Sequence, residues 1–454
     1  MKKKAVSSET KRSDDIPSGS PTFSDMRLSR DAKKLAVNVD GVSASVINAL
    51  RRSIISDVPS AAFGFDPTCG GGKGEDPMDT LRRCGIVVKK NASPTHNEML
   101  AGRLALVPIC VDEGQMAALA KDREMWTFAV RVKNDGAQVK IVTTADIQVF
   151  DKEGNPVSPA LRDALFPAND VTGDHIILTK LPPASKDYAA GEGDPEIDIS
   201  ALAAVGSESS HGHSRWCPVS VCYFTNRVDK KAADEAFAAR TPPIPRSQFD
   251  ALEALRYFYT NEYGEADRFE FRLESECGLH APFIVYMGFR ALIHRVRLFR
   301  AAIETRDTAK VAIASTAEIA AAKDDPFSKL AVTPRSDAVQ NNDDMFNVIV
   351  SHEDHTCGNL VQTLIYDFHL RPSTMGKAPS DILYIGYHQP HPLESCIVFR
   401  VRMAGNKASK SAVEAFFVSN LARIEKTLHE YAEEWVTFAR MRGPTKTFAL
   451  ESTE

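Results

Sequence analysis

Residues 353–370, EDHTCGNLVQTLIYDFHL, begin with polar and titratable side chains and continue as a helix with one apolar stripe. The start of this segment and the residue before it offer possible metal ligands or catalytic groups, namely His352, Asp354, His355 and Cys357. The same side chains could instead be the lead-in to a helix that buries one face, and both interpretations are open at this point. A similar helical segment, SASVINALRRSIISDVP, spans residues 43–59. The repetition indicates that one chain carries two copies of a related unit.

Length and composition restrict the class of protein. A chain of 454 residues exceeds one core of ordinary size, so we expect two or three domains. Hydrophobic residues make up 43% and charged residues 25%, which is typical of a soluble globular protein. The formal net charge of -5 argues against a protein whose main function is to bind the phosphate backbone of nucleic acids. We therefore do not expect direct, non-specific DNA binding.

The cysteines and the apolar stretches indicate in which cellular compartment the protein is expected. Eight cysteines occur without CxxC pairs, which favours reduced, buried thiols inside a cell over a disulfide framework. The basic start MKKK is followed by polar residues, so no signal-peptide pattern is present. The longest apolar stretch, LALVPICV, is far too short to span a membrane. We expect an intracellular, soluble protein with no membrane partner.

The first part of the chain predicts a tail, a strand and a helix. Residues 1–25 are polar and are expected to be a disordered tail. The strand-like KLAVNVDGV then leads to Ser43, a predicted N-cap. The following helix, which Asp57, Val58 and Pro59 end, has its apolar residues on one face and Arg51 and Arg52 off that face. The apolar face consists of Val46, Ile47, Leu50, Ile54 and Ile55.

The middle of the chain predicts a β-rich unit and a long helix. Residues 112–215 read as short alternating strands between Gly and Pro turns. CGGGKGEDP at 69–77 is expected to be an exposed loop, since Lys73 lacks the GK[ST] context of a phosphate loop. After the strand DRFEFRLES, a helix has apolar residues at alternating spacings of four and three, typical of a seam against another helix. The seam consists of Val285, Phe289, Leu292, Val296, Phe299 and Ile303.

The last third predicts a second unit of the same kind. Residues 306–344 are rich in Ala, Asp, Thr and Ser and are expected to be a linker. A strand, a helix, a strand pair and a last long helix follow, and this helix repeats the seam at Leu421, Ile424, Leu428, Tyr431, Trp435 and Phe438. Neither stripe can stay in water, because burial of each large side chain stabilises by roughly 1.5–3 kcal/mol. The two halves are therefore expected to pack against each other.

Several long motifs carry a family resemblance. NALRRSIISDVPSAAF, PTHNEMLAGRLALVPI, VTTADI and HSRWCPVSV occur in the order seen in the third-largest subunit of eukaryotic RNA polymerase II. They also resemble the archaeal D subunit and, more distantly, the bacterial alpha N-terminal domain. The motifs FNVIVSHEDHTCGNLVQTLI and GYHQPHPLESCIVFRVRM are similar to the small partner, the eleventh subunit or archaeal L. A fusion of both partners resembles the 3/11-type subunit of large nucleocytoplasmic DNA viruses.

The resemblance implies an α+β fold with two dimerisation domains. Residues 26–112 and 216–305 would form a discontinuous alpha/D-like dimerisation domain, with 113–215 as an inserted β-rich domain. Residues 345–442 would form the L-like dimerisation domain, and 443–454 a tail. The 69–85 and 229–250 segments are insertions relative to the family, and no function follows for them.

The resemblance also implies a function. In the family, the paired partners are an assembly platform on which the two large catalytic subunits of a DNA-directed RNA polymerase dock. The chain would be non-catalytic, without cofactor, joined by small 10-like and possibly 12-like subunits, and in contact with DNA only through the complex. It would act in transcription inside the cell or, if viral, in the virion and the host cytoplasm or nucleus. A tether of about 40 residues favours pairing within one chain, so a monomer is expected.

Residue roles follow from the same motifs. The arginines of NALRR and GRLALVP would dock a large subunit, with surface charge as the alternative interpretation; they are Arg51, Arg52 and Arg103. The HTxGN motif would form the turn and cap before the dimer helix, with His355 and Asn359 as the turn and cap residues. This favours packing over catalysis for the opening cluster, and the helix would bury Leu360, Val361, Leu364, Ile365 and Phe368. The predicted internal interface consists of Val46, Leu50, Ile54, Phe289, Leu292, Val296, Leu360, Leu364, Phe368, Leu421, Leu428 and Trp435.

Two other function classes remain. A metallohydrolase could use His211, His213, Cys217 and Cys222, but Cys217 and Cys222 are an odd number of residues apart and would face opposite sides of a strand. The chain could also be a free scaffold or regulator derived from a polymerase subunit. We predict no catalytic residue, because no dense acidic motif resembles the Mg²⁺ cluster of a polymerase. We also predict no metal: some members of the family carry a cysteine-rich metal loop in the inserted domain, but no cysteine lies between Cys110 and Cys217 here.

Overall fold

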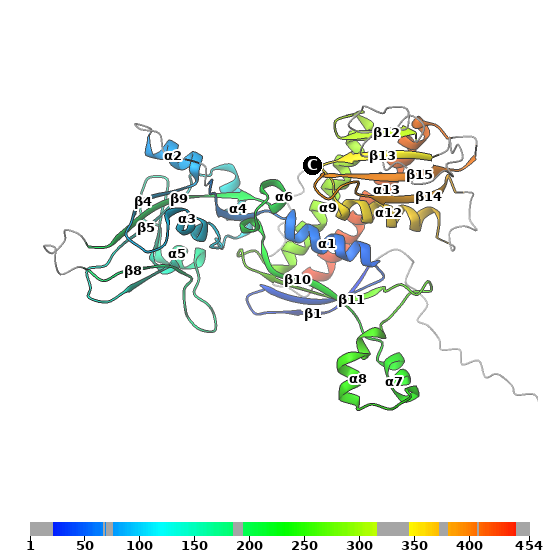
Figure 1. Cartoon of the computed structure of the whole chain (residues 1–454), viewed down its shortest axis with the longest axis horizontal. Coiled ribbons are helices and arrows are strands. Elements are labelled where there is room, and N and C mark those ends of the chain that lie inside the picture. The colour runs from blue at the N-terminus through cyan, green and yellow to red at the C-terminus, as the bar shows by residue number, and fades with distance from the viewer. Residues whose placement is uncertain are drawn as a thin grey trace, which may run out of the picture.

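The chain folds into a mixed α+β structure with several sheets (Figure 1). The computed structural model describes residues 21–66, 69, 76–184, 194–315, 345–371, 380–405 and 408–441. Two four-stranded sheets lie on opposite sides of a central group of helices, and a third lobe extends to one side (Figure 1). The central helices come from both ends of the chain, so the prediction that the halves pack together is confirmed.

The N-terminal half contains an antiparallel sheet in the order β1-β2-β11-β10. Its strands are β1 (Thr22–Leu28), β2 (Lys34–Asp40), β11 (Arg268–Ser275) and β10 (Val219–Asn226). Apolar and polar residues alternate along β2 and β11, so one face of the sheet is buried. Since β1 begins at Thr22, the expected disordered tail is wrong for residues 22–25. Residues 1–20 lie outside the described part of the chain.

Two helices pack against each other in this half: α1 (Ala44–Ser56) and α9 (Ala281–Glu304). Ser43 is the N-cap of α1, as predicted, and its side chain accepts a hydrogen bond from the backbone N–H of Val46. A Cβ at Gly288 of α9 would lie 2.6 Å from Cγ1 of Ile54 and 3.0 Å from Cδ1 of Leu50. A glycine is therefore required where the two helices cross closely.

The side lobe is built around a five-stranded antiparallel sheet in which β9 is central. Its strands are β3 (Ser60–Phe63), β4 (Ile86–Asn91), β5 (Thr127–Lys133), β7 (Ile147–Phe150) and β9 (Glu196–Gly206), and a separate ribbon pairs β6 (Lys140–Thr143) with β8 (Ile177–Leu181). The lobe also contains α3 (Asn97–Ala105), α4 (Glu113–Lys121), η1 (Thr144–Asp146) and α5 (Pro159–Leu165). β3 and β4 precede the expected domain boundary at residue 112, yet both pair with β9. This sheet therefore joins strands from both sides of that boundary.

The C-terminal half repeats the arrangement with the antiparallel order β12-β13-β15-β14. Its strands are β12 (Val311–Ser315), β13 (Met345–Ser351), β14 (Ile382–His388) and β15 (Cys396–Met403), and its helices are α12 (His355–His369) and α13 (Lys410–Arg440). β12 lies inside the predicted linker 306–344, so that prediction is wrong for residues 311–315. Linker residues 316–344 lie outside the described residues.

The two insertions contain helices. α7 (Lys230–Ala239) and α8 (Arg246–Leu252), followed by η3 (Ala254–Arg256), form a small unit that projects from the N-terminal sheet (Figure 1). α2 (Pro77–Cys84) lies in the other insertion, most of whose glycine-rich part is outside the described residues. Cys69 and Cys84 form a disulfide, so the expectation of reduced thiols is wrong for this pair. The other six cysteines are free thiols, three of them buried.

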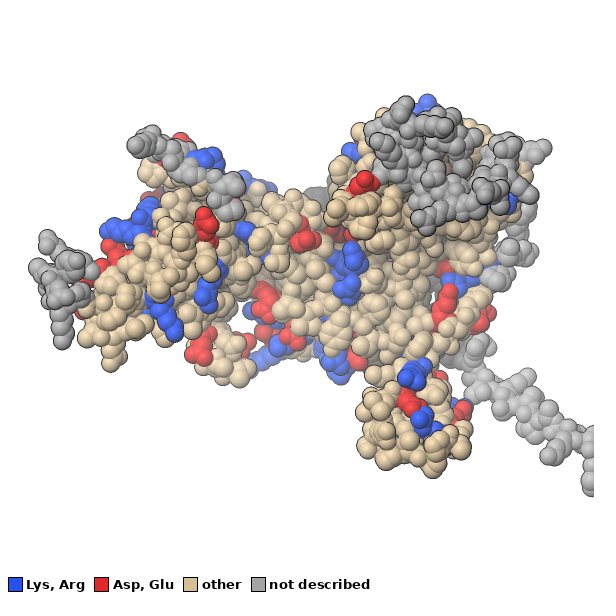
Figure 2. Space-filling view, in the orientation of Figure 1, with Lys and Arg blue, Asp and Glu red and all other residues tan. Residues whose placement is uncertain are grey.

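Neither sign of charge dominates the face of the molecule seen in Figure 2. Figure 2 shows Lys and Arg interspersed with Asp and Glu on the face in view, with no continuous band of either. This agrees with the small net charge of -5. Within the described ranges, each helix is too short or too polar to cross a bilayer.

Candidate functional site: the junction between the two halves

The longest contact between the halves is the packing of α9 against α13. The seam residues predicted on both helices are all buried. Trp435 of α13 is fully buried, and its indole N–H donates to the backbone carbonyl of Pro282 at 2.9 Å. Phe23 of β1 closes the end of this contact, with its ring centroid 5.1 Å from that of Trp435 in an edge-to-face arrangement. The N-terminal strand is thus tied to the last helix.

Aromatic side chains continue this contact toward the C-terminal sheet. The ring of Phe299 on α9 is stacked against that of Phe399 on β15, with centroids 5.9 Å apart. Phe299 also lies 6.1 Å from Phe417 of α13. All three are buried. One side chain of the N-terminal half therefore enters the core of the C-terminal half.

A carboxylate is placed beside this apolar seam. Glu425 of α13 is 9% exposed and accepts from Nε of Arg297 at 2.9 Å. Nη2 of Arg300 lies 3.1 Å from its other oxygen. Both arginines are on α9, so this group of charges also joins the two halves.

The second contact, between α1 and α12, is polar. The hydroxyl oxygens of Ser45 on α1 and Thr363 on α12 are 2.9 Å apart, and Nδ2 of Asn359 donates to Ser45 Oγ at 2.9 Å. Nε of Arg52 donates to Thr356 Oγ1 at 2.6 Å, and its Nη2 to Asp354 Oδ2 at 3.1 Å. Four side chains of the HTCGN region and the helix after it thus point at α1.

Arg295 of α9 links both halves in one charged cluster. Its Nη2 donates to Glu353 Oε2 at 2.5 Å and to Asp354 Oδ1 at 2.9 Å, while its Nη1 lies 3.3 Å from Asp57 Oδ2. The guanidinium is 20% exposed and Glu353 13% exposed, so water screens this pair weakly. Asp57 ends α1 and Asp354 begins α12, so one side chain ties three helices.

The cluster shifts the pKa values of its members. Burial raises the pKa of Glu353, and the attraction of Arg295 offsets this only in part. Burial also opposes the charge of Asp354, but Arg295 and the donors of Thr356 outweigh it and lower its pKa to about 2. Burial would lower the pKa of Arg295, yet the carboxylates of Glu353 and Asp57 raise it above its ordinary value. The closed junction thus favours the charged forms of Arg295 and Asp354 and disfavours the charged form of Glu353.

The residues predicted to form the internal interface do not all contact the other half; some pack within their own half. All are buried except Phe368, which is partly buried and lies under the guanidinium of Arg423 at 3.7 Å from the ring centroid. The stripe of α1 faces its own half, since Leu50 and Ile54 meet Gly288 of α9. The side chains of α1 that cross to the other half are instead the polar Ser45 and Arg52.

The predicted docking arginines differ in environment. Arg103 on α3 is exposed, and Arg51 is partly buried with its Nε bonded to Asn48. Arg52 lies off the apolar stripe, as predicted, but its side chain bonds Thr356 and Asp354 inside the junction. Arg52 thus joins α1 to α12 within the chain.

The predicted cap at the HTxGN motif needs correction. The N-cap of α12 is Asp354, whose side chain accepts from the backbone N–H of Thr356 at 2.8 Å. His355 is the first helical residue, and its Nδ1 lies 3.3 Å from the hydroxyl of Tyr387. Asn359 lies within the helix and bonds Ser45. An acidic side chain suits this position because it faces the positive end of the helix dipole.

The histidine and cysteine candidates do not form a metal site in the described part of the chain, which contains no group of three or more His, Cys, Asp or Glu side chains able to hold a metal ion. The ring of His211 lies 4.7 Å from that of Trp216, and Nδ1 of His213 accepts from the backbone N–H of Arg215. Cys217 precedes β10 and Cys222 lies within it. At the other cluster, Asp354 and Cys357 belong to the cap and the buried face of α12.

Sequence reasoning missed the charged residues that bridge the halves, namely Arg295, Arg297, Arg300, Glu353 and Glu425. The sequence signal for them was ambiguous, since the three arginines and Glu425 lie off an apolar seam where exposed charges are usual, and Glu353 lies before the start of α12. Comparisons with protein-family models and with curated proteins return no match, so the family resemblance stands on the sequence motifs alone.

Proposed function

We propose that this chain is a non-catalytic assembly-platform subunit of a DNA-directed RNA polymerase, in which one polypeptide takes the place of a two-subunit dimer. The observation that supports this is the paired architecture: each half has a four-stranded antiparallel sheet, a short helix and a long helix, and the helices face each other between the sheets. The finer assignment, an alpha/D-like domain with an inserted β-rich domain fused to an L-like domain, is part of this proposal.

The proposal names the partners as the two large catalytic subunits, with 10-like and possibly 12-like small subunits. DNA would be reached only through this complex, inside the cell or, if the protein is viral, in the virion and the host cytoplasm or nucleus. Affinity purification of the full chain from its natural source, followed by mass spectrometry, tests this directly. Recovery of both large subunits in equal amounts with the chain is expected. A chain recovered only with other proteins would instead make it a free scaffold or regulator.

The docking role of the arginines can be separated from the internal junction. Arg51→Ala with Arg103→Ala is the suitable variant, because Arg52 also bonds α12. We expect unchanged thermal unfolding and reduced recovery of a large subunit. Arg256→Ala, at an exposed arginine outside the predicted docking motifs, is the matched control. Full recovery of the large subunit with the double variant would contradict the docking role.

Two measurements on the isolated chain test the rest of the proposal. Light scattering should give the mass of a monomer, because the helices that would pair with a second copy are already covered within the chain. Template-directed assays should show no RNA extension by the isolated chain. A stable homodimer or nucleotide incorporation would refute the corresponding part.

A further inference from the structure

A cavity of about 560 Å³ lies where the side lobe meets the segment that leads into β10. It is lined by residues after β3, the end of α2, Arg123 after α4, and the turn formed by α6 (Glu208–His211) and η2 (Ser214–Trp216). A volume of this size is in the range of small-molecule sites, about 300–1,000 Å³. The junction between the halves uses none of its residues.

Two arginines of the lining, Arg123 and Arg215, carry positive charge without an ion-pair partner among the described residues. Nε of Arg123 donates to the carbonyl of Ala203 at 3.3 Å and its Nη1 to that of Arg82 at 3.2 Å. Nη1 of Arg215 donates to the carbonyl of Phe63 at 3.3 Å. Within the described part of the chain, neither arginine forms an ion pair, and Nε of Arg215 is buried without a hydrogen-bond partner. Both guanidinium groups are thus held by backbone and retain donors for another group.

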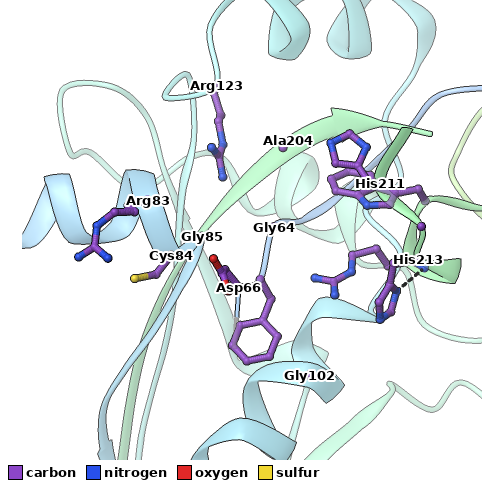
Figure 3. A pocket seen from close by; sticks show the side chains of 14 residues that line it. Gly64, Asp66, Arg83, Cys84, Gly85, Gly102, Arg123, Ala204, His211 and His213 are labelled. Carbon is purple, nitrogen blue, oxygen red and sulfur yellow. Dashed lines mark hydrogen bonds between the residues drawn. The ribbon is translucent and has the colours of Figure 1, made fainter. Parts of the chain in front are cut away.

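Both guanidinium groups are partly buried, which is unusual for a charged side chain without an ion-pair partner. It lowers the pKa of Arg123 and of Arg215, although both stay protonated at neutral pH. Figure 3 shows Arg123 pointing into the cavity and Arg83 pointing away from it. Asp66 also lines the cavity and makes other interactions. Within the described residues neither Arg123 nor Arg215 is paired with this or another carboxylate, and partly desolvated guanidinium groups without an ion-pair partner favour an anion that arrives from outside.

The opposite wall is aromatic. The ring of His211 lies over that of Trp216, tilted by 35°, and Gly206 permits this because a Cβ there would lie 2.6 Å from Cε1 of His211. Burial and Arg215 lower the pKa of His213, which keeps its ring neutral. Because Nδ1 of His213 accepts from the backbone N–H of Arg215, its other ring nitrogen carries a proton and can donate.

We propose that this cavity binds a small phosphorylated ligand of nucleotide size, with Arg123 and Arg215 holding the phosphate and the His211–Trp216 wall packing against a flat ring. Planar guanidinium donors match phosphate oxygens in pairs, and a doubly charged phosphate balances two cations better than one carboxylate does. This site is additional to the assembly role and independent of it.

Isothermal titration of the full chain with ATP, pyrophosphate, adenosine and a hexaglutamate peptide tests the proposal. ATP and pyrophosphate should bind, adenosine should bind at least tenfold more weakly than ATP, and raised salt should weaken binding. Arg215→Met and Arg123→Met should each lower ATP affinity about tenfold or more, since each removes hydrogen bonds to a charged group. Arg131→Met, at a half-exposed arginine elsewhere in the lobe, should leave ATP affinity unchanged.

Lysine substitutions keep the test decisive if a methionine variant does not fold. Arg123→Lys and Arg215→Lys keep the charge and lose the paired donors, so each should weaken ATP binding by a smaller factor. Absence of ATP and pyrophosphate binding by the parent chain would overturn the proposal. Unchanged affinity in both arginine variants, or binding of hexaglutamate in preference to the phosphates, would also overturn it.

Discussion

Two of the contacts that join the halves are built from different side chains. Between α9 and α13 the contact is largely apolar and aromatic, with Trp435 and Phe299 as its most enclosed members. Between α1 and α12 it consists of hydroxyl, amide and charged groups, with Arg295 as the hub of the charges. Apolar packing is not directional, whereas a hydrogen bond weakens steeply when its donor and acceptor are misaligned. We therefore expect the first contact to supply most of the stability and the second to set the alignment of the halves.

The largest effect should come from the apolar contact. Trp435→Ala removes a fully buried indole and leaves a cavity between α13, α9 and β1, so we expect a loss of about 3–5 kcal/mol in the free energy of unfolding. Urea denaturation measures this. Glu433→Ala, at an exposed position on the same helix, should cost little. A loss below about 1 kcal/mol for Trp435→Ala would mean that the seam is not the main source of stability.

The hub of the polar contact should come next. Arg295→Met leaves Glu353 buried without its cation, and removal of one partner of a buried pair costs about 3 kcal/mol or more. Because Glu353 can then escape the penalty by binding a proton, the loss should be smaller at pH 5 than at pH 8. Arg290→Met, at an exposed arginine of the same helix, is the control. An equal loss at both pH values would contradict the role assigned to Glu353.

Acid should weaken the same contact through Asp354. Its pKa is about 2 in the folded chain against 3.8 in the unfolded chain, so the unfolded state binds more protons between these values. The contribution of Asp354 to stability is therefore complete above pH 3.8 and is lost as the pH falls toward 2. Asp354→Asn should flatten the pH dependence of unfolding in this window. An unaltered slope in the variant would show that Arg295 and Thr356 do not hold the charge.

The charge beside the seam should matter less. Glu425→Gln keeps the shape of the side chain and removes its attraction for Arg297 and Arg300, both partly open to water. Screening limits the expected loss to about 1 kcal/mol. Thermal unfolding at low and high salt should show the loss shrinking as salt rises. Glu434→Gln, exposed on the same helix, provides the comparison.

The smallest expected effect tests whether the hydroxyl pair between α1 and α12 helps to align the two halves. Ser45→Ala and Thr363→Val each remove one hydroxyl of the pair that joins α1 to α12. A double-mutant cycle should give a coupling energy of about 0.5–1 kcal/mol. In a chain cut within residues 316–344, the coupling should appear in the affinity of the two fragments. Zero coupling would assign alignment to the charged cluster alone.

Much of the fold could be predicted because apolar spacing selects the helix face. The spacing of three and four along α9 and α13 identified the buried stripe on each, and Ser43 identified the start of α1. β12 could not be predicted, because five residues of VAIAS carry a weak strand signal and pair only because β13 offers an edge. The partners of Arg52 and Arg295 could not be predicted either, since ionic partners more than fifty residues away depend on how the helices cross.

β12 also has a consequence for the order in which the protein is made. It follows α9 closely in the chain, yet it forms the edge of the C-terminal sheet. A ribosome therefore releases this strand together with the N-terminal half, before β13 exists, and domains generally fold from the N-terminus during synthesis. The first half thus presents an open strand on which the second can nucleate. A single chain of this kind orders the two steps in time, whereas two separately translated chains would have to meet by diffusion.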